Sequence, residues 1–158
     1  MVSNQYYRKR KFKTMGKNSG FTLIELMTVI GIIALLTAIA IPSYFKWLPK
    51  HRVGSAARYV MSSVEFARII AIKTNAAVTV NFDFDNDSLT VVDSGATTLR
   101  TRRMPEDVDL RDNGLGTPVT FNGHGFSTQS GQVVVENNSN AAINRTIMLT
   151  LGGNASIH

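Results

Sequence analysis

An apolar run over residues 21–41, FTLIELMTVIGIIALLTAIAI, constrains this chain more than any other feature. The run carries one charged side chain, Glu25, and contains no proline. As a helix rising 1.5 Å per residue it would extend roughly 31 Å, which is close to the hydrocarbon thickness of a bilayer. A carboxylate at membrane depth costs about 2.5–3.5 kcal/mol unless it is paired, so Glu25 requires a partner or a role.

The formal net charge of +6 belongs to the segment before this run. Residues 1–20 hold six basic side chains and no acidic one, and the other 138 residues carry eleven basic and eleven acidic side chains. The charge is therefore no sign of a nucleic-acid partner once residues 1–20 are removed. The positive charge before the run predicts a cytoplasmic N-terminus and a C-terminal part on the other side of the membrane.

Catalytic and metal-binding residue patterns are missing from the sequence. There is no cysteine, which excludes a disulfide framework, a thiolate metal site and a cysteine nucleophile. The three histidines, His51, His124 and His158, are far apart in sequence and match no metal-ligand or nucleophile pattern. We expect no enzymatic activity, no metal and no cofactor.

Three kinds of processing are compatible with a basic leader and an apolar run. An ordinary secretory signal peptide would be cut near Ala38-Ile39-Ala40, although this run is longer than usual and carries Glu25. A cut after Gly20 would instead keep the apolar helix in the mature chain. The third possibility is an uncleaved single-pass anchor.

Residues 20–26, GFTLIEL, resemble the class III signal of type IV pilins and type II secretion pseudopilins. The resemblance implies that a prepilin peptidase cuts between Gly20 and Phe21 and methylates the new amine of Phe21. It further implies that Pro42 is the helix-breaking proline that these proteins often carry.

Glu25 has two possible interactions in such a protein. A cut after Gly20 creates an ammonium group at Phe21, and the Glu25 of a neighbouring subunit, buried among apolar helices, could pair with it. The resemblance implies that this pair sets the axial register of a filament. Alternatively, Glu25 interacts within its own chain, because a helix N-terminus favours a carboxylate in its first turn.

The rest of the chain changes from helical to strand periodicity. Apolar residues recur every three or four positions over 53–74, which predicts an amphipathic helix, and Pro42 predicts a kink or melted turn before it. From residue 78 the alternation is that of strands. We therefore predict an α+β, pilin-like fold, in which a long N-terminal helix with a transmembrane first half packs on a C-terminal antiparallel β-sheet domain. The predicted segments are a removed leader (1–20), a transmembrane or filament-core helix (21–42), its amphipathic continuation (43–75) and a periplasmic β-rich domain (76–158).

The β-rich region begins with a predicted hairpin of residues 78–84 and 89–92. The spacing of Asp83, Asp85 and Asp87 is similar to the start of a calcium loop, but Ser88 and Ser94 occupy its glycine and glutamate positions, which favours a plain turn. Further predicted elements are a long connection over 93–118 with one short strand near Leu99, and strands over 119–121, 132–136 and 146–151.

A second resemblance covers the domain. Residues 63–75, the pattern F-x-x-x-G from Phe121 to Gly125, and a last strand ending in Gly152-Gly153 resemble H-type minor pseudopilins and FimT-like minor pilins. Some FimT-like proteins bind DNA through a terminal Gly-Arg-x-Arg element, but residues 152–155 of this chain contain no arginine. We therefore expect no nucleic-acid partner.

The two resemblances together imply a minor pseudopilin of a type II secretion system, with a FimT-like minor type IV pilin in pilus assembly or DNA uptake as the alternative. The implied partners are a prepilin peptidase, other pilins or pseudopilins, and inner-membrane lipid.

Overall fold

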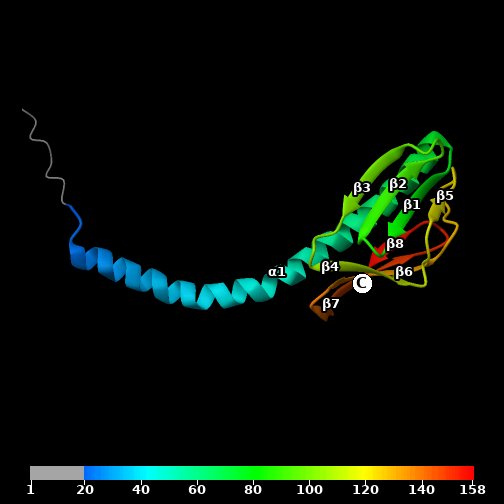
Figure 1. Ribbon diagram of the computed structural model, residues 1–158. Coiled ribbons are helices and arrows are strands. Elements are labelled where there is room, and N and C mark those ends of the chain that lie inside the picture. The colour runs from blue at the N-terminus through cyan, green and yellow to red at the C-terminus, as the bar shows by residue number, and fades with distance from the viewer. Residues whose placement is uncertain (1–19) are drawn as a thin grey trace, which may run out of the picture. The chain divides into compact units, whose positions relative to one another are not determined.

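The computed structural model describes residues 20–158, so the predicted leader lies outside the described residues apart from Gly20. The described chain forms one helix followed by eight strands (Figure 1). It divides into two compact units at Ala40 and Ile41, and each unit is described by itself. The elements are α1 (Leu23–Thr74), β1 (Val78–Asp83), β2 (Ser88–Asp93), β3 (Thr98–Arg103), β4 (Val108–Asn113), β5 (Val119–Phe121), β6 (Gly131–Asn137), β7 (Asn140–Leu149) and β8 (Ala155–Ile157).

α1 continues without interruption through Pro42 and Pro49, so the predicted helix break at Pro42 is wrong. A proline lacks one backbone donor, and its ring presses on the carbonyl four residues earlier. A long helix can absorb both effects by bending, while the hydrogen bonds on either side persist. Each proline therefore costs α1 one hydrogen bond without ending it.

The second half of α1 buries one face, as the three- and four-residue spacing predicts. Met61, which the pattern placed on this face, is only partly buried. Ser63 takes a buried position instead, and its hydroxyl donates to the Tyr59 carbonyl at 2.9 Å, which satisfies it locally. Most of these side chains are small, so strands can approach the helix closely. The buried residues are Val53, Ala56, Ala57, Val60, Ser63, Val64, Ala67 and Ala71.

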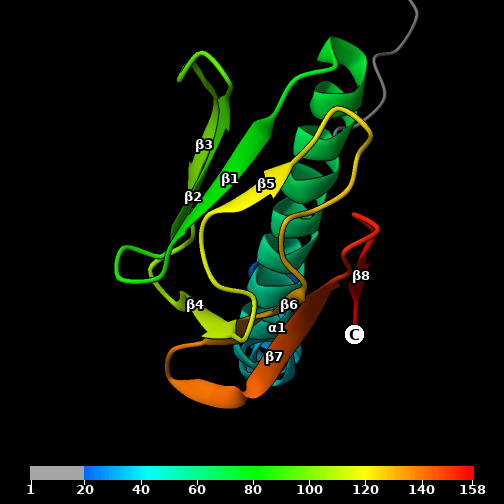
Figure 2. The same ribbon diagram turned by 90° about the vertical axis from the view of Figure 1, so that its right-hand side faces the viewer.

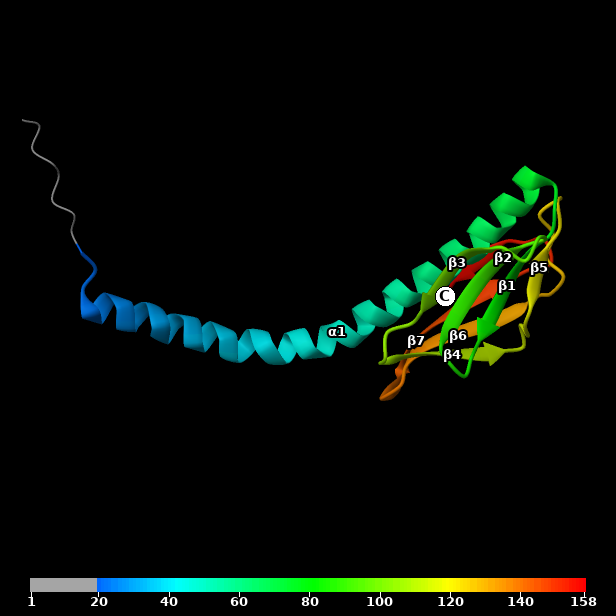
Figure 3. The same ribbon diagram turned by 45° about the horizontal axis from the view of Figure 1, so that its top comes forward.

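Two four-stranded antiparallel sheets pack beside this part of α1 (Figures 2 and 3). The strand order is β3-β2-β1-β5 in the first sheet and β4-β6-β7-β8 in the second. The predicted hairpin forms as β1 and β2, with Phe82 opposite Leu89. The fold-class prediction of a long helix packed on antiparallel sheets is thereby confirmed.

One hydrophobic core joins the buried face of α1 to the inner faces of both sheets. Along β1 and β2 every second residue points inward, which is the period that the sequence predicts. The sheet residues of the core include Val78, Val80, Phe82, Leu89, Val91, Val119 and Phe121 from the first sheet and Val108, Leu110, Val133, Val135, Ile147 and Leu149 from the second.

Two strands differ from the prediction. β4 lies in the stretch 93–118, which was predicted to hold only one short strand. β4 was not predicted because it has only two inward apolar residues, Val108 and Leu110, and they are interrupted by charged ones. The prediction that the last strand ends in Gly-Gly is also wrong. β7 ends at Leu149, and Gly152 and Gly153 form the turn into the short strand β8.

Gly123 and Gly125, in the loop after β5, contact the end of α1. A Cβ on Gly123 would lie 2.5 Å from the Asn75 side-chain oxygen, and one on Gly125 would lie 2.7 Å from Ile72 Cδ1. Residues 63–75 and the F-x-x-x-G pattern, which the sequence presents separately, are therefore packed against each other. The absence of a side chain at these two glycines allows the loop after β5 to touch the helix.

Gly153 is the most constrained of these glycines. Its φ is +77°, and a Cβ there would lie 2.1 Å from the Gly125 carbonyl oxygen and 3.1 Å from Arg68 Nε. Arg68 of α1 is partly buried, and its Nη1 donates to Asn154 Oδ1 at 2.7 Å. The turn between β7 and β8 is thus fastened to α1 by contact and by a hydrogen bond.

We expect Gly153→Ala to destabilise the domain because alanine at this positive φ costs about 1–3 kcal/mol before the overlap with Gly125 is counted. Thermal unfolding of the full chain should show a clearly lower midpoint. Gly152→Ala is the matched control, since its nearest neighbour, Thr150 Oγ1, is 3.7 Å away and its φ is not positive. Equal midpoints for the two variants would contradict this role of Gly153.

Candidate processing and assembly site

Gly20 and Phe21 precede the first turn of α1 and are exposed, with 85% of the Phe21 surface accessible. Among residues 20–158, no atom lies within 4 Å of a Cβ placed on Gly20. No described residue therefore shields the peptide bond between Gly20 and Phe21. The predicted cleavage position thus lies in an accessible, non-helical segment next to the helix start.

Thr22 caps the helix. Its hydroxyl oxygen accepts a hydrogen bond from the Glu25 backbone N–H at 3.2 Å, and its carbonyl accepts the first helical bond from the Leu26 N–H at 3.1 Å. A Thr followed three residues later by Glu is the sequence signature of such a cap. The sequence analysis missed this role of Thr22, although the signal was present.

The apolar first half of α1 has no covering within residues 20–158. It is the one helix of this part of the chain that is long and apolar enough to cross a membrane, and none of its most apolar window is buried. Thr28 and Thr37 donate their hydroxyls to carbonyls of the preceding turn, so neither needs an outside partner. The most exposed large apolar side chains here are Phe21, Leu23, Ile24, Leu35, Leu36 and Ile39, each 64% or more accessible.

Glu25 lies in the first turn of α1 and is exposed. Within the described residues no hydrogen-bond donor or cation contacts its carboxylate, because the cap uses its backbone N–H and the hydroxyl of Thr22. The favourable helix dipole is its only local interaction. The structure therefore places Gly20, Phe21 and Glu25 together at the start of α1, whereas Pro42 lies far along the helix.

Aromatic side chains follow the apolar run. Tyr44, Phe45 and Trp47 are each more than half exposed, and the Trp47 ring lies 4.6 Å from that of His51. Amphipathic aromatic rings are typical of the boundary between membrane and water.

Two of the three aspartates with calcium-like spacing, Asp83 and Asp87, accept hydrogen bonds in or next to the hairpin turn. The Asp83 carboxylate accepts hydrogen bonds from the Asn86 side chain at 2.8 Å and from its backbone N–H at 3.0 Å, and both lower the pKa of Asp83. Asp87 Oδ1 accepts the Leu110 N–H at 2.8 Å, which links the hairpin turn to β4. The plain-turn interpretation accounts for these two carboxylates without a metal.

The arginines of β3 stack on aromatic rings of α1. The Arg100 guanidinium lies 4.2 Å from the centre of the Phe66 ring, and that of Arg102 lies 5.0 Å from the Tyr59 ring. These are cation–π distances. The two arginines therefore attach an edge strand to the helix.

The fold is that of a pilin-like protein, with a long helix packed through its second half on antiparallel sheets. Residues 56–153 match the family described as Type II transport protein GspH, and the chain belongs to this family. Residues 15–41 match the prokaryotic N-terminal methylation motif. The family resemblance drawn from the sequence is confirmed.

Curated relatives match over about a quarter of the chain. Prepilin peptidase-dependent protein D of Escherichia coli (strain K12) is 67% identical over 36 residues, covering 23% of this chain and 25% of that protein. The type IV major pilin protein PilA of Myxococcus xanthus (strain DK1622) is 50% identical over 40 residues, covering 25% of this chain and 18% of PilA. The chain thus spans about a quarter or less of the length of these two relatives.

Solved structures match through the domain. The type IV minor pilin FimU of Pseudomonas aeruginosa has a TM-score of 0.60 at 17% identity, covering 68% of this chain and 89% of FimU. The minor pseudopilin EpsH of the Vibrio cholerae type 2 secretion system has a TM-score of 0.58 at 13% identity, covering 68% and 96%. At these identities the likeness shows the fold alone.

Proposed function

We propose that this chain is a minor pseudopilin of a type II protein secretion system. A prepilin peptidase removes residues 1–20 and methylates Phe21. The mature chain remains in the inner membrane until it is assembled into a periplasmic pseudopilus. Its domain lies in the periplasm, and its role is structural and not enzymatic. The observation that carries the proposal is the uncovered apolar half of α1, with one carboxylate free of local partners, on a domain of the GspH family.

The apolar surface needs a nonaqueous environment both before and after assembly. Lipid covers it in the membrane, and the helices of other subunits cover it in a filament. Within residues 21–41 only Glu25 has a polar side chain that lacks a partner among residues 20–158. The ammonium that cleavage creates at Phe21 of a neighbour is a compact cation that would neutralise this carboxylate in the apolar filament core.

A minor type IV pilin is the second candidate. The likeness to FimU, with a TM-score of 0.60, is as good as the likeness to EpsH, with 0.58. DNA uptake through the β7–β8 turn is disfavoured, because Gly153 and Asn154 are engaged by Arg68 and no arginine is present in residues 152–155.

Deletion of the gene in its own bacterium distinguishes the two candidates. We expect secreted enzymes to accumulate in the periplasm while surface pili remain, because a pseudopilus and not a pilus would lack a subunit. Immunoblots of the culture medium and electron microscopy of the cells measure the two outcomes. Loss of pili with normal secretion would favour the minor pilin instead.

The mature chain should begin at Phe21. Intact-mass and N-terminal analysis of the protein from membranes is expected to give a chain lacking residues 1–20 and carrying one extra methyl group. A chain that begins at Met1 would identify an uncleaved anchor, and one that begins at Ile41 would identify an ordinary signal peptide.

Glu25→Ala should leave membrane insertion intact and strongly reduce incorporation into filaments, because removing one partner of a buried ion pair costs about 3–5 kcal/mol. Crosslinking of the variant to other pilin-like subunits in membranes measures the loss. Glu65→Ala, at an exposed position in the second half of α1, is the charge-matched control. Thr22→Ala tests the helix cap separately, since it removes the capping hydroxyl of Thr22 but keeps the carboxylate of Glu25. Normal crosslinking by Glu25→Ala would contradict the pairing.

A further inference from the structure

A cleft lies between α1 and the hairpin of β6 and β7, within the unit Ile41–His158. It consists of two adjoining hollows of about 250 and 530 Å³ that share Lys50, Ala142 and Ile143. Its walls come from segments that are about ninety residues apart in sequence. The remaining lining residues are Val53, Asn144 and Arg145 in the smaller hollow and Lys46, Pro49, Asn137 and Asn140 in the larger one.

The cleft is positively charged. Lys46 and Lys50 come from α1, Arg145 comes from β7, and none of the lining residues is acidic. The ion pairs found within residues 20–158 are Arg52 with Asp107 and Arg111 with Glu136, and neither uses a cation of the cleft. Two cations thus line each hollow, Lys50 with Arg145 in the smaller and Lys46 with Lys50 in the larger, in a chain whose residues 21–158 are neutral overall.

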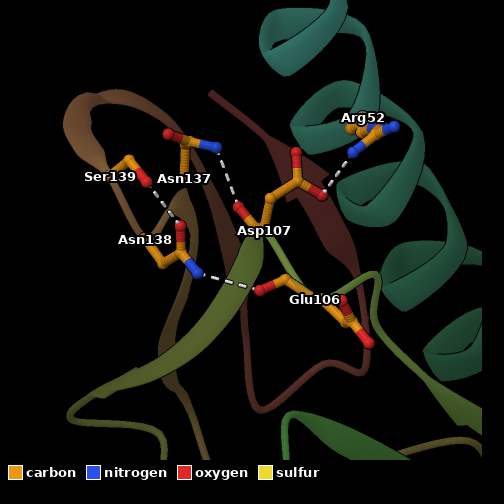
Figure 4. A network of polar contacts seen from close by, with 6 residues as sticks. All are labelled: Arg52, Glu106, Asp107, Asn137, Asn138 and Ser139. Carbon is orange, nitrogen blue, oxygen red and sulfur yellow. Dashed lines mark hydrogen bonds and ion pairs between the residues drawn. The ribbon is translucent and has the colours of Figure 1, made fainter.

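A polar network holds the hairpin beside α1 (Figure 4). Arg52 Nη1 lies 3.0 Å from Asp107 Oδ1, so this carboxylate is paired with a cation that does not line the cleft. The side chain of Asn137 donates to the Asp107 carbonyl and that of Asn138 to the Glu106 carbonyl, each at 2.8 Å. These bonds connect α1 and the hairpin, the two walls of the cleft, through residues 106–107, so the hollow is a built feature of the domain.

The lining combines charge with apolar surface. Val53, Pro49 and Ile143 provide apolar contacts, while the lysines and the arginine provide N–H donors. Ammonium and guanidinium groups are the side chains that bind phosphate oxygens in proteins, the guanidinium through two parallel bonds. A ligand with a phosphodiester beside an apolar stem fits both parts of the lining.

The chain keeps this cleft close to the headgroup region. Lys46 and Lys50 follow the last residue of the apolar run, Ile41, by five and nine positions in the same helix, which is about 8 and 14 Å at 1.5 Å per residue. The polar region of a bilayer extends roughly 5–8 Å beyond the hydrocarbon on each side. Flexible lysine side chains reach the remaining distance.

We propose that this cleft binds the phosphate of an anionic phospholipid in the membrane that holds residues 21–41. The proposal rests on the membrane-inserted state in the proposed function. The bound headgroup fixes the depth and orientation of the domain before assembly, and it is released when the helix leaves the membrane for the filament.

Native mass spectrometry of the full mature chain in a neutral detergent tests the proposal. The probes are phosphatidylglycerol, phosphatidylcholine and inorganic phosphate, each titrated separately. We expect phosphatidylglycerol to bind more tightly than the other two. Lys50→Gln/Arg145→Gln should weaken it roughly 25-fold, since each cation near an anionic headgroup contributes a factor of about five.

The matched control is Lys73→Gln/Arg103→Gln, which removes the same charge from exposed positions outside the cleft. This control and the conservative variant Arg145→Lys should both keep the preference for phosphatidylglycerol. The single variants Lys50→Gln and Arg145→Gln, each about fivefold weaker, replace the double variant if thermal unfolding shows that it is misfolded.

Several outcomes would overturn the proposal. Equal binding of phosphatidylglycerol and phosphatidylcholine would mean that no specific site exists. The same conclusion would follow if Lys73→Gln/Arg103→Gln lost as much affinity for phosphatidylglycerol as Lys50→Gln/Arg145→Gln. Inorganic phosphate binding as tightly as the lipid would make the cleft an oxyanion site without a lipid. If Lys50→Gln/Arg145→Gln kept normal lipid binding but lost crosslinking to other filament subunits, the cleft would instead bind a carboxylate of another subunit. Failure of the wild-type chain to insert into vesicles of either lipid would instead refute the membrane-inserted state of the proposed function.

Discussion

The exposed apolar half of α1 is the constraint on which the rest of this molecule depends. In water, its large side chains would cost roughly 25 cal/mol for each Å² of apolar surface left uncovered. No part of residues 20–158 covers them, and both threonines in the run turn their hydroxyls back onto the helix. The segment is therefore suited to an apolar environment that other molecules provide.

The domain is organised so that the other half of the same helix is thoroughly covered. Alanines and Ser63 on its buried face let two sheets approach closely, and Gly125 and Gly153 let two loops touch its last turns. Arg68 closes this arrangement, because it is enclosed by both glycines and bonded to Asn154. A subunit pulled out of a membrane by its helix would need such a firm attachment between helix and domain.

Much of this architecture could be predicted from the sequence, because it depends on strong periodic patterns. The run over residues 21–41, the buried stripe after Val53 and the hairpin of β1 and β2 repeat their apolar residues at clear intervals. β4 escaped prediction because it presents few apolar residues and pairs with β6, which is distant in sequence, and β8 escaped because it is only three residues long. The helix break predicted at Pro42 is absent because the cooperativity of a long helix outweighs the loss of one backbone hydrogen-bond donor. The cleft beside Lys50 could not be foreseen, since it requires α1 and β7 to be neighbours.

The cap at Thr22 bears directly on how Glu25 is used. In a capping box, the glutamate side chain commonly bonds back to the N-cap backbone and is thereby occupied. Here the hydroxyl of Thr22 satisfies the Glu25 N–H, while the carboxylate makes no bond within the described residues. The intrachain interpretation of Glu25 is then limited to the helix dipole, which is worth about 0.3–1 kcal/mol at an exposed terminus. This stabilisation by the dipole is smaller than the roughly 2.5–3.5 kcal/mol that an unpaired carboxylate costs at membrane depth. The energetic difference favours a partner from outside the chain, and the amine that cleavage would create at Phe21 of a neighbour has the required charge.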